Sequence, residues 1–245
     1  MLGLGFWSPD FPTLKALIDG VALPEVPPAA ALLPPALRRR AGNLPRMTAE
    51  VIAQVATAPD LANTPVVYGS VLGETNIAVQ MMGSFIEGEG LPSPTAFHNS
   101  VHNAPVGYLS IAVGCHSLSP AIAAGPDTCA MALEEALVIL ADRGGDVVVV
   151  LADEQVPVPF TPASPFPSAA AALHLRAGRQ SGALAWMGHV RLGDGSRPSL
   201  PGNLERHPCA PAFGLLLSVA SRATGPISLA GADGRSWRVD LEVPS

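Results

Sequence analysis

The chain has 245 residues, of which 48% are apolar and 14% are charged, and its formal net charge is −6. This composition excludes an intrinsically disordered chain, which would be more polar and more highly charged. The negative charge disfavours nucleic acid and anionic membrane surfaces as partners, because both repel an acidic protein. The length allows one large domain with a substantial core, or two small domains, and we expect residues 1–245 to form a single domain.

The three cysteines lack the paired spacing of a disulfide framework, which suits the reducing cytosol. The N-terminus, MLGLGFWSPDF, has no basic segment followed by a long apolar stretch, so it does not read as a signal peptide. The longest apolar run, around 147–152, is far shorter than the roughly 20 residues that a membrane-spanning helix needs. The sequence therefore predicts a cytoplasmic protein without a membrane span.

Strands and helices are predicted to alternate over the first 155 residues, and this order indicates an α/β layered fold. The expected strands are short apolar runs that end near glycine or proline, at 1–6, 65–70, 119–124 and 146–154. The expected helices lie at 13–19, 47–57, 75–87, 99–112 and 127–142. In the second of these helices, Thr48 is placed near the N-cap and Glu50 in the first turn. The strand at 146–154, DVVVVLADE, should be buried on both faces.

Proline dominates residues 157–167, which are predicted to form a loop, as does the Pro- and Ala-rich segment 21–36. The run AAAALHL within 168–176 fits either a strand or a short helix. Further predictions are a strand at 183–191, a helix at 211–222, and a hairpin of 226–230 and 236–243 around the Asp233-Gly234 turn.

The most informative local feature is the corner at Gly125-Pro126. The expected strand SPAIAA precedes the corner, and the long helix followed by DVVVVLADE comes after it. Such a corner presents side chains and backbone N–H groups at a helix N-terminus, where a thiolate or an oxyanion is stabilised.

These residues resemble the β-ketoacyl synthases. In that family, an S-x-S-I-A-T-A-C-type run places the nucleophilic cysteine at the start of a long buried helix, and a D-x-V-x-V-x-G-x-A-E strand follows. The run NAPVGYLSI, from Asn103, resembles the family's N-x-x-A-G-H/R-L-x-I helix, and LGLGFWSPDFPTLKALIDG is similar to the family's opening. With no gaps from Asn103, the nucleophile position falls at Pro126. Proline suits a first helical turn but supplies no nucleophile.

The resemblance, strongest over 1–176, implies a thiolase-like fold of the N-terminal-half type. This fold has a mixed five-stranded sheet, with a C-terminal helix and a β-hairpin added. The family's C-terminal motifs, H-G-T-x-T and N-x-F-G-F-G-G-x-N, are absent. The short length and the missing cysteine resemble the short β-ketoacyl synthase N-terminal-like proteins of aryl polyene, xanthomonadin and flexirubin pathways. That likeness implies a non-catalytic, chain-length-factor-like subunit. It would need no cofactor, pair with a catalytic ketosynthase, and help to extend chains on an acyl carrier protein.

The resemblance also implies two groups of interface residues. The strand before the corner is a sheet edge that pairs with the partner, and the segment before the Asn103 helix reaches the partner's acyl pocket. The residues that these roles select are Ala96, Phe97, His98, Ser100, Ser119, Ala121, Ile122 and Ala123. Phe97 is the bulky residue that would limit the growing chain, unless it is an ordinary core side chain.

Other interpretations stay open at this point. Cys129 could act as a nucleophile, which would make the chain a stand-alone acyltransferase or thioesterase, or it could be a packing residue on the stripe that it shares with Leu133. The chain could also form a homodimer that binds acyl chains or carrier protein without catalysis. His98 and His102 share one helix face, but two ligands alone do not predict a metal site. The arginines at 38–40 and 46 form either a solvated face or a docking patch.

Overall fold

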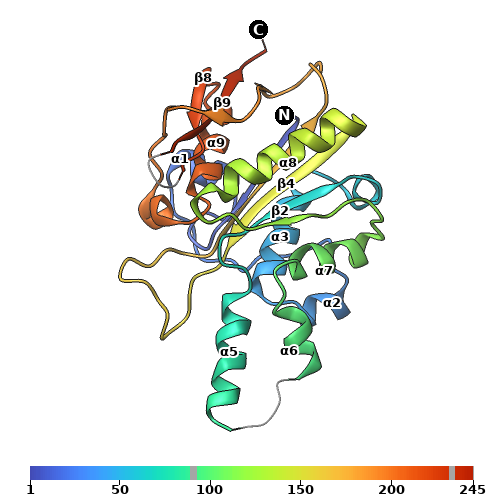
Figure 1. Cartoon of the computed structure of the whole chain (residues 1–245), viewed down its shortest axis with the longest axis vertical. Coiled ribbons are helices and arrows are strands. Elements are labelled where there is room, and N and C mark those ends of the chain that lie inside the picture. The colour runs from blue at the N-terminus through green and yellow to red at the C-terminus, as the bar shows by residue number, and fades with distance from the viewer. Residues whose placement is uncertain (89–92, 232–234, 245) are drawn as a thin grey trace.

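The computed structural model describes residues 1–88, 93–231 and 235–244 (Figure 1). Within these ranges, the main sheet has five strands in the order β1-β5-β4-β2-β3, which places β4 at the centre. Its strands are β1 (Gly3–Trp7), β2 (Val66–Gly69), β3 (Ala121–Ile122), β4 (Asp146–Asp153) and β5 (Ala169–Arg176). The α/β class and the mixed five-stranded sheet expected from the sequence are therefore confirmed.

The central strand β4 has one parallel and one antiparallel neighbour. It runs parallel to β2, with Val148 opposite Val66, and antiparallel to β5, with Val149 opposite Leu173. The predicted burial of β4 on both faces is confirmed, since its side chains from Val147 onward are buried. The ambiguous segment 168–176 is a strand because it pairs with β4 on one side and β1 on the other.

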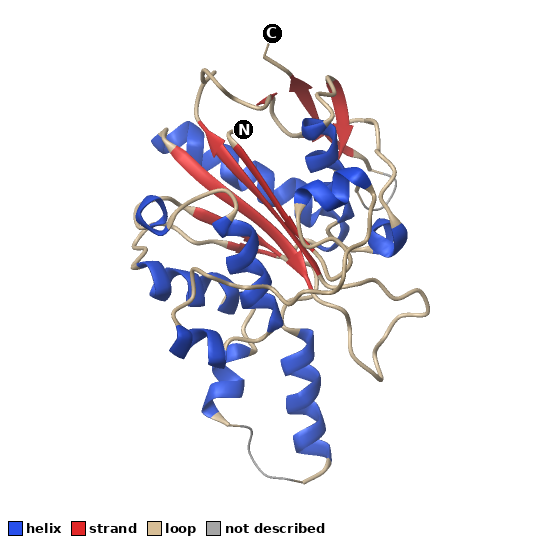
Figure 2. Cartoon of the chain, turned by 180° about the vertical axis from the view of Figure 1, so that it is seen from behind, coloured by secondary structure: helices blue, strands red, loops and turns tan. Residues whose placement is uncertain are grey.

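Two helical layers cover the two faces of this sheet (Figure 2). Successive side chains of a strand point to opposite faces, and the valines of β4 divide accordingly. Val147 and Val149 join one hydrophobic cluster, whereas Val148 and Val150 join the other. The helices of the first cluster are α1 (Leu14–Asp19), α8 (Thr128–Arg143) and α9 (Ala210–Ala220), and those of the second include α3 (Asn43–Ala53) and α7 (Ala104–Val113).

The C-terminal residues form a second, smaller sheet. Its strands are β6 (Trp186–Met187), β7 (Arg191–Leu192), β8 (Gly225–Ser228) and β9 (Trp237–Glu242). The predicted hairpin is confirmed as the antiparallel pair β8–β9, and Ile227 and Val239 from it are buried in the cluster that α8 and α9 share. The Asp233-Gly234 turn predicted for it lies outside the described residues.

The bounds predicted for the helix at 47–57 were wrong. The helix is α3, Asn43–Ala53, and it carries Pro45 in its first turn, where the missing N–H has no helical partner to lose. Thr48, expected near the N-cap, is therefore buried in the middle of α3. The carboxyl group of Glu50 accepts a hydrogen bond from the backbone N–H of Ala30 at 2.9 Å, which ties the helix to the preceding loop.

The helix predicted at 99–112 begins later, as α7, because Pro105 lies in its first turn, and a separate short helix that was not expected, α6 (Pro94–Asn99), precedes it. Two strand predictions were too long. Of 119–124, only Ala121–Ile122 pairs as strand, and 183–191 holds β6 (Trp186–Met187) and the first residue of β7, Arg191, with residues 188–190 between them. Two further short helices were not expected, α2 (Pro35–Arg40) and α4 (Ala58–Leu61).

Helix α5 (Thr75–Ile86) is confirmed where the sequence predicts it, and Gly88 follows its end, whereas Gly90 lies outside the described residues. Together α5 and α6 extend away from the sheet as a contacting pair, which we call the helical arm (Figure 1). All residues of α5 are described, and none of them is buried. Helices that pack on a protein's own core bury an apolar stripe, so the arm offers its apolar side chains to solvent or to a partner.

Candidate functional site

The corner before α8 keeps the architecture of a strand-to-helix turn. Gly125 has a φ of 55°, a left-handed conformation that glycine adopts without strain, and residues 125–127 form one turn of 3₁₀ helix. The Thr128 hydroxyl closes the turn: it donates to the Gly125 carbonyl at 2.7 Å and accepts from the Ala124 N–H at 2.9 Å. Pro126 lies exposed on this turn, where the sequence places the nucleophile position.

Cys129, one residue into α8, is a packing residue by its surroundings. Its side chain is 2% exposed and belongs to the same hydrophobic cluster as Leu133. Burial raises the pKa of the Cys129 thiol to about 12. The thiol therefore stays protonated at neutral pH and is shielded from reagents, and both properties oppose a nucleophilic role.

A buried carboxyl group organises the C-terminal ends of β2 and β4. Asp153, at the end of β4, accepts hydrogen bonds from the Ser70 hydroxyl at 2.7 Å and from the backbone N–H groups of Val71 at 3.0 Å and Leu72 at 2.8 Å. The Cys209 thiol adds a fourth donor, with its Sγ 3.2 Å from the Asp153 carboxyl. Asp153 thus fixes the turn that leads from β2 toward α5.

His207 joins this group from the C-terminal part of the chain. Its Nε2 lies 3.1 Å from the backbone carbonyl of Asp153, and its Nδ1 accepts from the Cys209 N–H at 2.9 Å. Burial lowers the pKa of His207 to about 4, so the ring is neutral at pH 7. Burial and the nearby Asp153 also raise the pKa of Cys209 well above its usual value. Cysteine, histidine and aspartate therefore meet here as a buried structural unit without an activated thiol.

A second pair of carboxyl groups lies where the helical arm begins. Glu154 accepts from the Asn76 N–H at 2.9 Å in the first turn of α5. The side chain of Glu74 is buried, and both of its oxygens lack a hydrogen-bond partner among the described residues. Burial, together with the charge of Glu154, raises the pKa of Glu74 to about 8. Glu74 is consequently protonated at neutral pH, which lowers the free energy of keeping the pair buried.

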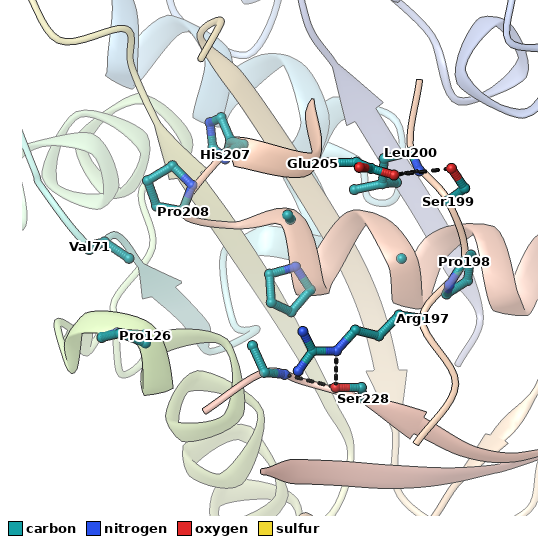
Figure 3. A pocket seen from close by; sticks show the side chains of 14 residues that line it. Val71, Pro126, Arg197, Pro198, Ser199, Leu200, Glu205, His207, Pro208 and Ser228 are labelled. Carbon is teal, nitrogen blue, oxygen red and sulfur yellow. Dashed lines mark hydrogen bonds between the residues drawn. The ribbon is translucent and has the colours of Figure 1, made fainter. Parts of the chain in front are cut away.

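A cavity of about 610 Å³ opens beside the corner (Figure 3). Pro126 and Val71 form one side, the segment from His207 to Pro211 forms another, and Arg197 reaches in from the loop before α9. Pro126, which the sequence resemblance aligns with the nucleophile, therefore lines a cavity that the C-terminal residues complete.

The sequence matches a family model described as β-ketoacyl synthase, N-terminal domain, over residues 17–224. The chain belongs to this family. A search of curated proteins found no match.

Solved structures with the same fold include ketosynthase complexes, which match the chain at low identity. The ketosynthase ApeO in complex with its chain length factor ApeC, from Xenorhabdus doucetiae, matches with 22% identity, a TM-score of 0.69, and coverage of 97% of this chain and 96% of that one. The ishigamide ketosynthase/chain length factor matches with 13% identity, a TM-score of 0.73, and coverage of 100% and 99%. The AntDE:AntF complex of a type II polyketide acyl carrier protein with its ketosynthase matches with 12% identity, a TM-score of 0.75, and coverage of 99% and 98%.

These matches confirm the thiolase-like ketosynthase fold that the sequence predicts. The fold extends over the whole chain, including the C-terminal residues that pack beside the corner. None of the helices in the described ranges has the length and hydropathy needed to cross a membrane.

The structure places the predicted interface residues in two separate regions. Ala96, Phe97 and His98 lie on α6, in the helical arm, and the Ser100 hydroxyl donates to the Phe97 carbonyl at 2.8 Å just after the helix. Phe97 is 64% exposed, so it is not a core residue of this chain. The other region is the edge of the main sheet at β3, whose neighbourhood contains Ser119, Ala121, Ile122 and Ala123.

The two histidines considered as metal ligands take separate roles. His98 lies beside the Asn99 side chain, whereas His102 Nε2 lies 3.0 Å from the Ser70 carbonyl. Among the described residues, no group of three or more His, Cys, Asp or Glu side chains is arranged to hold a metal ion. The arginine cluster is partly structural, since Arg38 donates to the Leu33 carbonyl at 2.9 Å and Arg46 to the Arg38 carbonyl at 2.8 Å.

Sequence reasoning missed the residues that join the C-terminal segment to the corner. Asp153 carried a usable signal, because it is a polar residue directly after a fully apolar run. His207 and Arg197 carried none, because they are far from the corner in sequence and belong to no motif. Only the folded chain brings them to the cavity.

Proposed function

We propose that this chain is a non-catalytic, chain-length-factor-like subunit that pairs with a catalytic ketosynthase. The pair would extend acyl chains, of the aryl polyene type, on an acyl carrier protein. The observation that carries the proposal is the corner itself, which retains its turn and its helix, with Pro126 at the position that the sequence resemblance assigns to the nucleophile. Two matched structures pair a ketosynthase with a chain length factor, and a third holds an acyl carrier protein, which supports this reading.

The edge of the main sheet supports pairing with a partner. Within the described residues, β3 bonds to β2 on one side, at Ala121 opposite Tyr68, and its other side is an open edge. Its side chains are small or apolar and carry no charge, so nothing on the strand discourages pairing with another chain. A partner strand added here would extend the sheet across two subunits.

The helical arm supports pairing independently. Met82, Phe85, Ile86 and Phe97 are exposed on α5 and α6, and exposed apolar side chains gathered in one region mark interaction surfaces. A partner that covered the arm would remove these side chains from water, at about 25 cal/mol for each Å² of apolar surface. The arm and the open edge would then belong to one interface.

Phe97 would be the residue that limits chain length. A pocket of about 350 Å³ lies between α2, α6 and α7, and it is lined by His98 and Tyr108 among others, so the arm already borders space for an apolar group. From this position, an exposed phenyl ring could reach into the partner's acyl tunnel and block its end. Removal of the ring would lengthen the tunnel.

The test is co-expression with a ketosynthase from the same organism. We expect a stable one-to-one complex that extends acyl carrier protein-bound chains. Phe97→Ala should preserve the complex and shift the products to longer chains, as read by mass spectrometry. Phe160→Ala is the matched control, because this ring is 58% exposed on the loop between β4 and β5, outside α5 and α6.

Three results would contradict the proposal: no complex with any ketosynthase, acylation of this chain without a partner, or the same product shift from both phenylalanine variants. A stable homodimer that ignores the co-expressed ketosynthase would favour the homodimer interpretation instead.

A further inference from the structure

The cavity beside the corner has the properties of a ligand site that the proposed pairing leaves unused. Its volume, about 610 Å³, falls within the roughly 300–1,000 Å³ of small-molecule pockets. Its wall is mostly apolar, with Pro126, Pro198, Leu200 and Pro211 contributing to it. Proline and leucine walls favour an apolar ligand body, since its burial removes apolar surface from water.

One cationic side chain is held at this wall. The Arg197 Nε donates to the Ser228 hydroxyl at 2.9 Å, which fixes the guanidinium group against β8 (Figure 3). In the part of the chain that the structure describes, no acidic side chain forms an ion pair with Arg197, and no hydrogen bond involves its two terminal amino groups. A planar guanidinium with free N–H donors is suited to bidentate binding of a carboxylate.

The other polar groups at the cavity do not compete for this role. His207 is neutral at pH 7, because burial lowers its pKa to about 4. One oxygen of Glu205 already accepts from the Ser199 hydroxyl at 3.0 Å and from the Leu200 N–H at 3.2 Å. Arg197 is therefore the one cation among the described residues lining the cavity that is placed to meet an anionic group.

We propose that this cavity binds a small amphipathic carboxylic acid. The carboxylate pairs with the Arg197 guanidinium, and the alkyl or aryl body lies along Pro126 and Leu200. The binding is non-covalent, and it occurs beside Pro126 at the corner. The site would thus act as a sensor of free acyl or aryl acids, separate from the partner interface at the arm and the sheet edge.

The test uses three eight-carbon probes with different head groups, titrated by calorimetry into the full chain, or into its complex with a ketosynthase if the two co-purify. We expect octanoate to bind, octanol to bind at least ten-fold more weakly, and octylamine not to bind. Arg197→Gln should weaken octanoate binding roughly ten- to a hundred-fold, the factor expected for a lost hydrogen-bonded charge pair. The control is Arg222→Gln, because Arg222 is exposed and bonds to the Pro244 carbonyl away from the cavity.

A second pair of variants tests the cavity without changing a charge. Gly214 lies on α9 at the cavity wall, and a Cβ there would meet only Pro198 at an ordinary contact distance of 3.5 Å. Gly214→Leu should therefore fold, fill the cavity and abolish octanoate binding. Gly107→Leu is the control, since this glycine lies in α7 with open space around its missing Cβ.

The fluorescence of Trp237 reports the location of binding, because its indole N–H donates to Asp127, the neighbour of Pro126, at 3.0 Å. Octanoate should change the emission of the native chain but not that of Trp237→Phe. The proposal is overturned if octanol binds as tightly as octanoate, if Arg197→Gln or Gly214→Leu binds normally, or if octanoate does not bind at millimolar concentration. None of these outcomes bears on pairing with a ketosynthase, so the two proposals fail separately.

Discussion

Among single side chains, Glu74 makes the stability of the chain depend on pH. Its folded-state pKa is raised to about 8 by burial and by the charge of Glu154, whereas its unfolded value is near 4.5. At a pH between these two pKa values, Glu74 is ionised in the unfolded chain and protonated in the folded chain. The free energy of unfolding therefore falls as pH rises through this window, by about 4 to 5 kcal/mol in all.

Replacement of Glu74 by Gln should remove this dependence. The amide has the same shape and no proton to lose, so we expect Glu74→Gln to match the native chain near pH 5 and to exceed its stability by several kcal/mol, on the order of 4, at pH 8. The measurement is urea denaturation across that range. Glu87→Gln, at the exposed end of α5, is the control and should follow the native profile. A constant difference between Glu74→Gln and the native chain at all pH values would contradict the assignment.

The three thiols should differ sharply in reactivity. Cys129 and Cys209 are buried and have raised pKa values, whereas Cys115 is half-buried. We expect Ellman's reagent to label one thiol quickly in the folded chain and all three after denaturation. Cys115→Ser should remove the fast reaction, and Cys129→Ser should not. Loss of the fast reaction in Cys129→Ser would instead favour an enzyme that uses this cysteine.

At the scale of elements, the end of β4 positions the start of the helical arm. Asp153 holds the turn after β2, and the adjacent Glu154 accepts from the first turn of α5. The arm has no buried residue in α5 to anchor it along its length. Its orientation therefore depends on hydrogen bonds made at its base.

Substitution of Asp153 tests this dependence. Asparagine has the size of aspartate, but one acceptor oxygen is replaced by an NH₂ donor. In this buried site, that donor would face other donors, which are backbone N–H groups or a thiol. We expect Asp153→Asn to lower the free energy of unfolding by about 2 to 4 kcal/mol and to increase amide hydrogen exchange at the start of α5. Asp142→Asn, on an exposed residue of α8, should change stability by less than about 0.5 kcal/mol. Equal effects of the two variants would contradict this role.

Elements with strong local signals could be predicted from the sequence, whereas their partners in space could not. The valines of β4, the glycine-closed helix α8 and the C-terminal hairpin all lie where the sequence indicates. The start of α3 and the start of α7 were missed, because proline fits a first helical turn as well as it ends a helix. Of the candidate site, only the corner at Gly125-Pro126 was predicted from the sequence. The links from Asp153 to His207 and from Arg197 to Ser228 join segments with no common motif.

For the whole molecule, the apolar arm and the open sheet edge determine how the chain behaves in solution. An isolated copy exposes both surfaces, and we expect it to self-associate as concentration rises. Ile86→Ser should reduce this association and weaken the complex with a ketosynthase by roughly ten-fold or more, because Ile86 is 85% exposed and would be covered by a partner. Sedimentation of the chain alone and a binding titration of the pair measure the two effects.

The control for this prediction is Val138→Ser. Val138 is also β-branched and 54% exposed, but it lies on α8, which packs on the main sheet away from the arm. It should leave both measurements unchanged. If Val138→Ser weakens the complex and Ile86→Ser does not, the interface lies on the α8 side of the molecule.

The exposed arm also has a consequence for the lifetime of the chain in a cell. Chaperones and proteases recognise uncovered apolar segments, and marginally protected chains are continuously removed by them. A copy that finds no partner would keep its arm uncovered and be degraded, while a paired copy would be spared. Surplus synthesis would then be corrected by turnover, and the amount of this subunit would follow the amount of the protein that covers it.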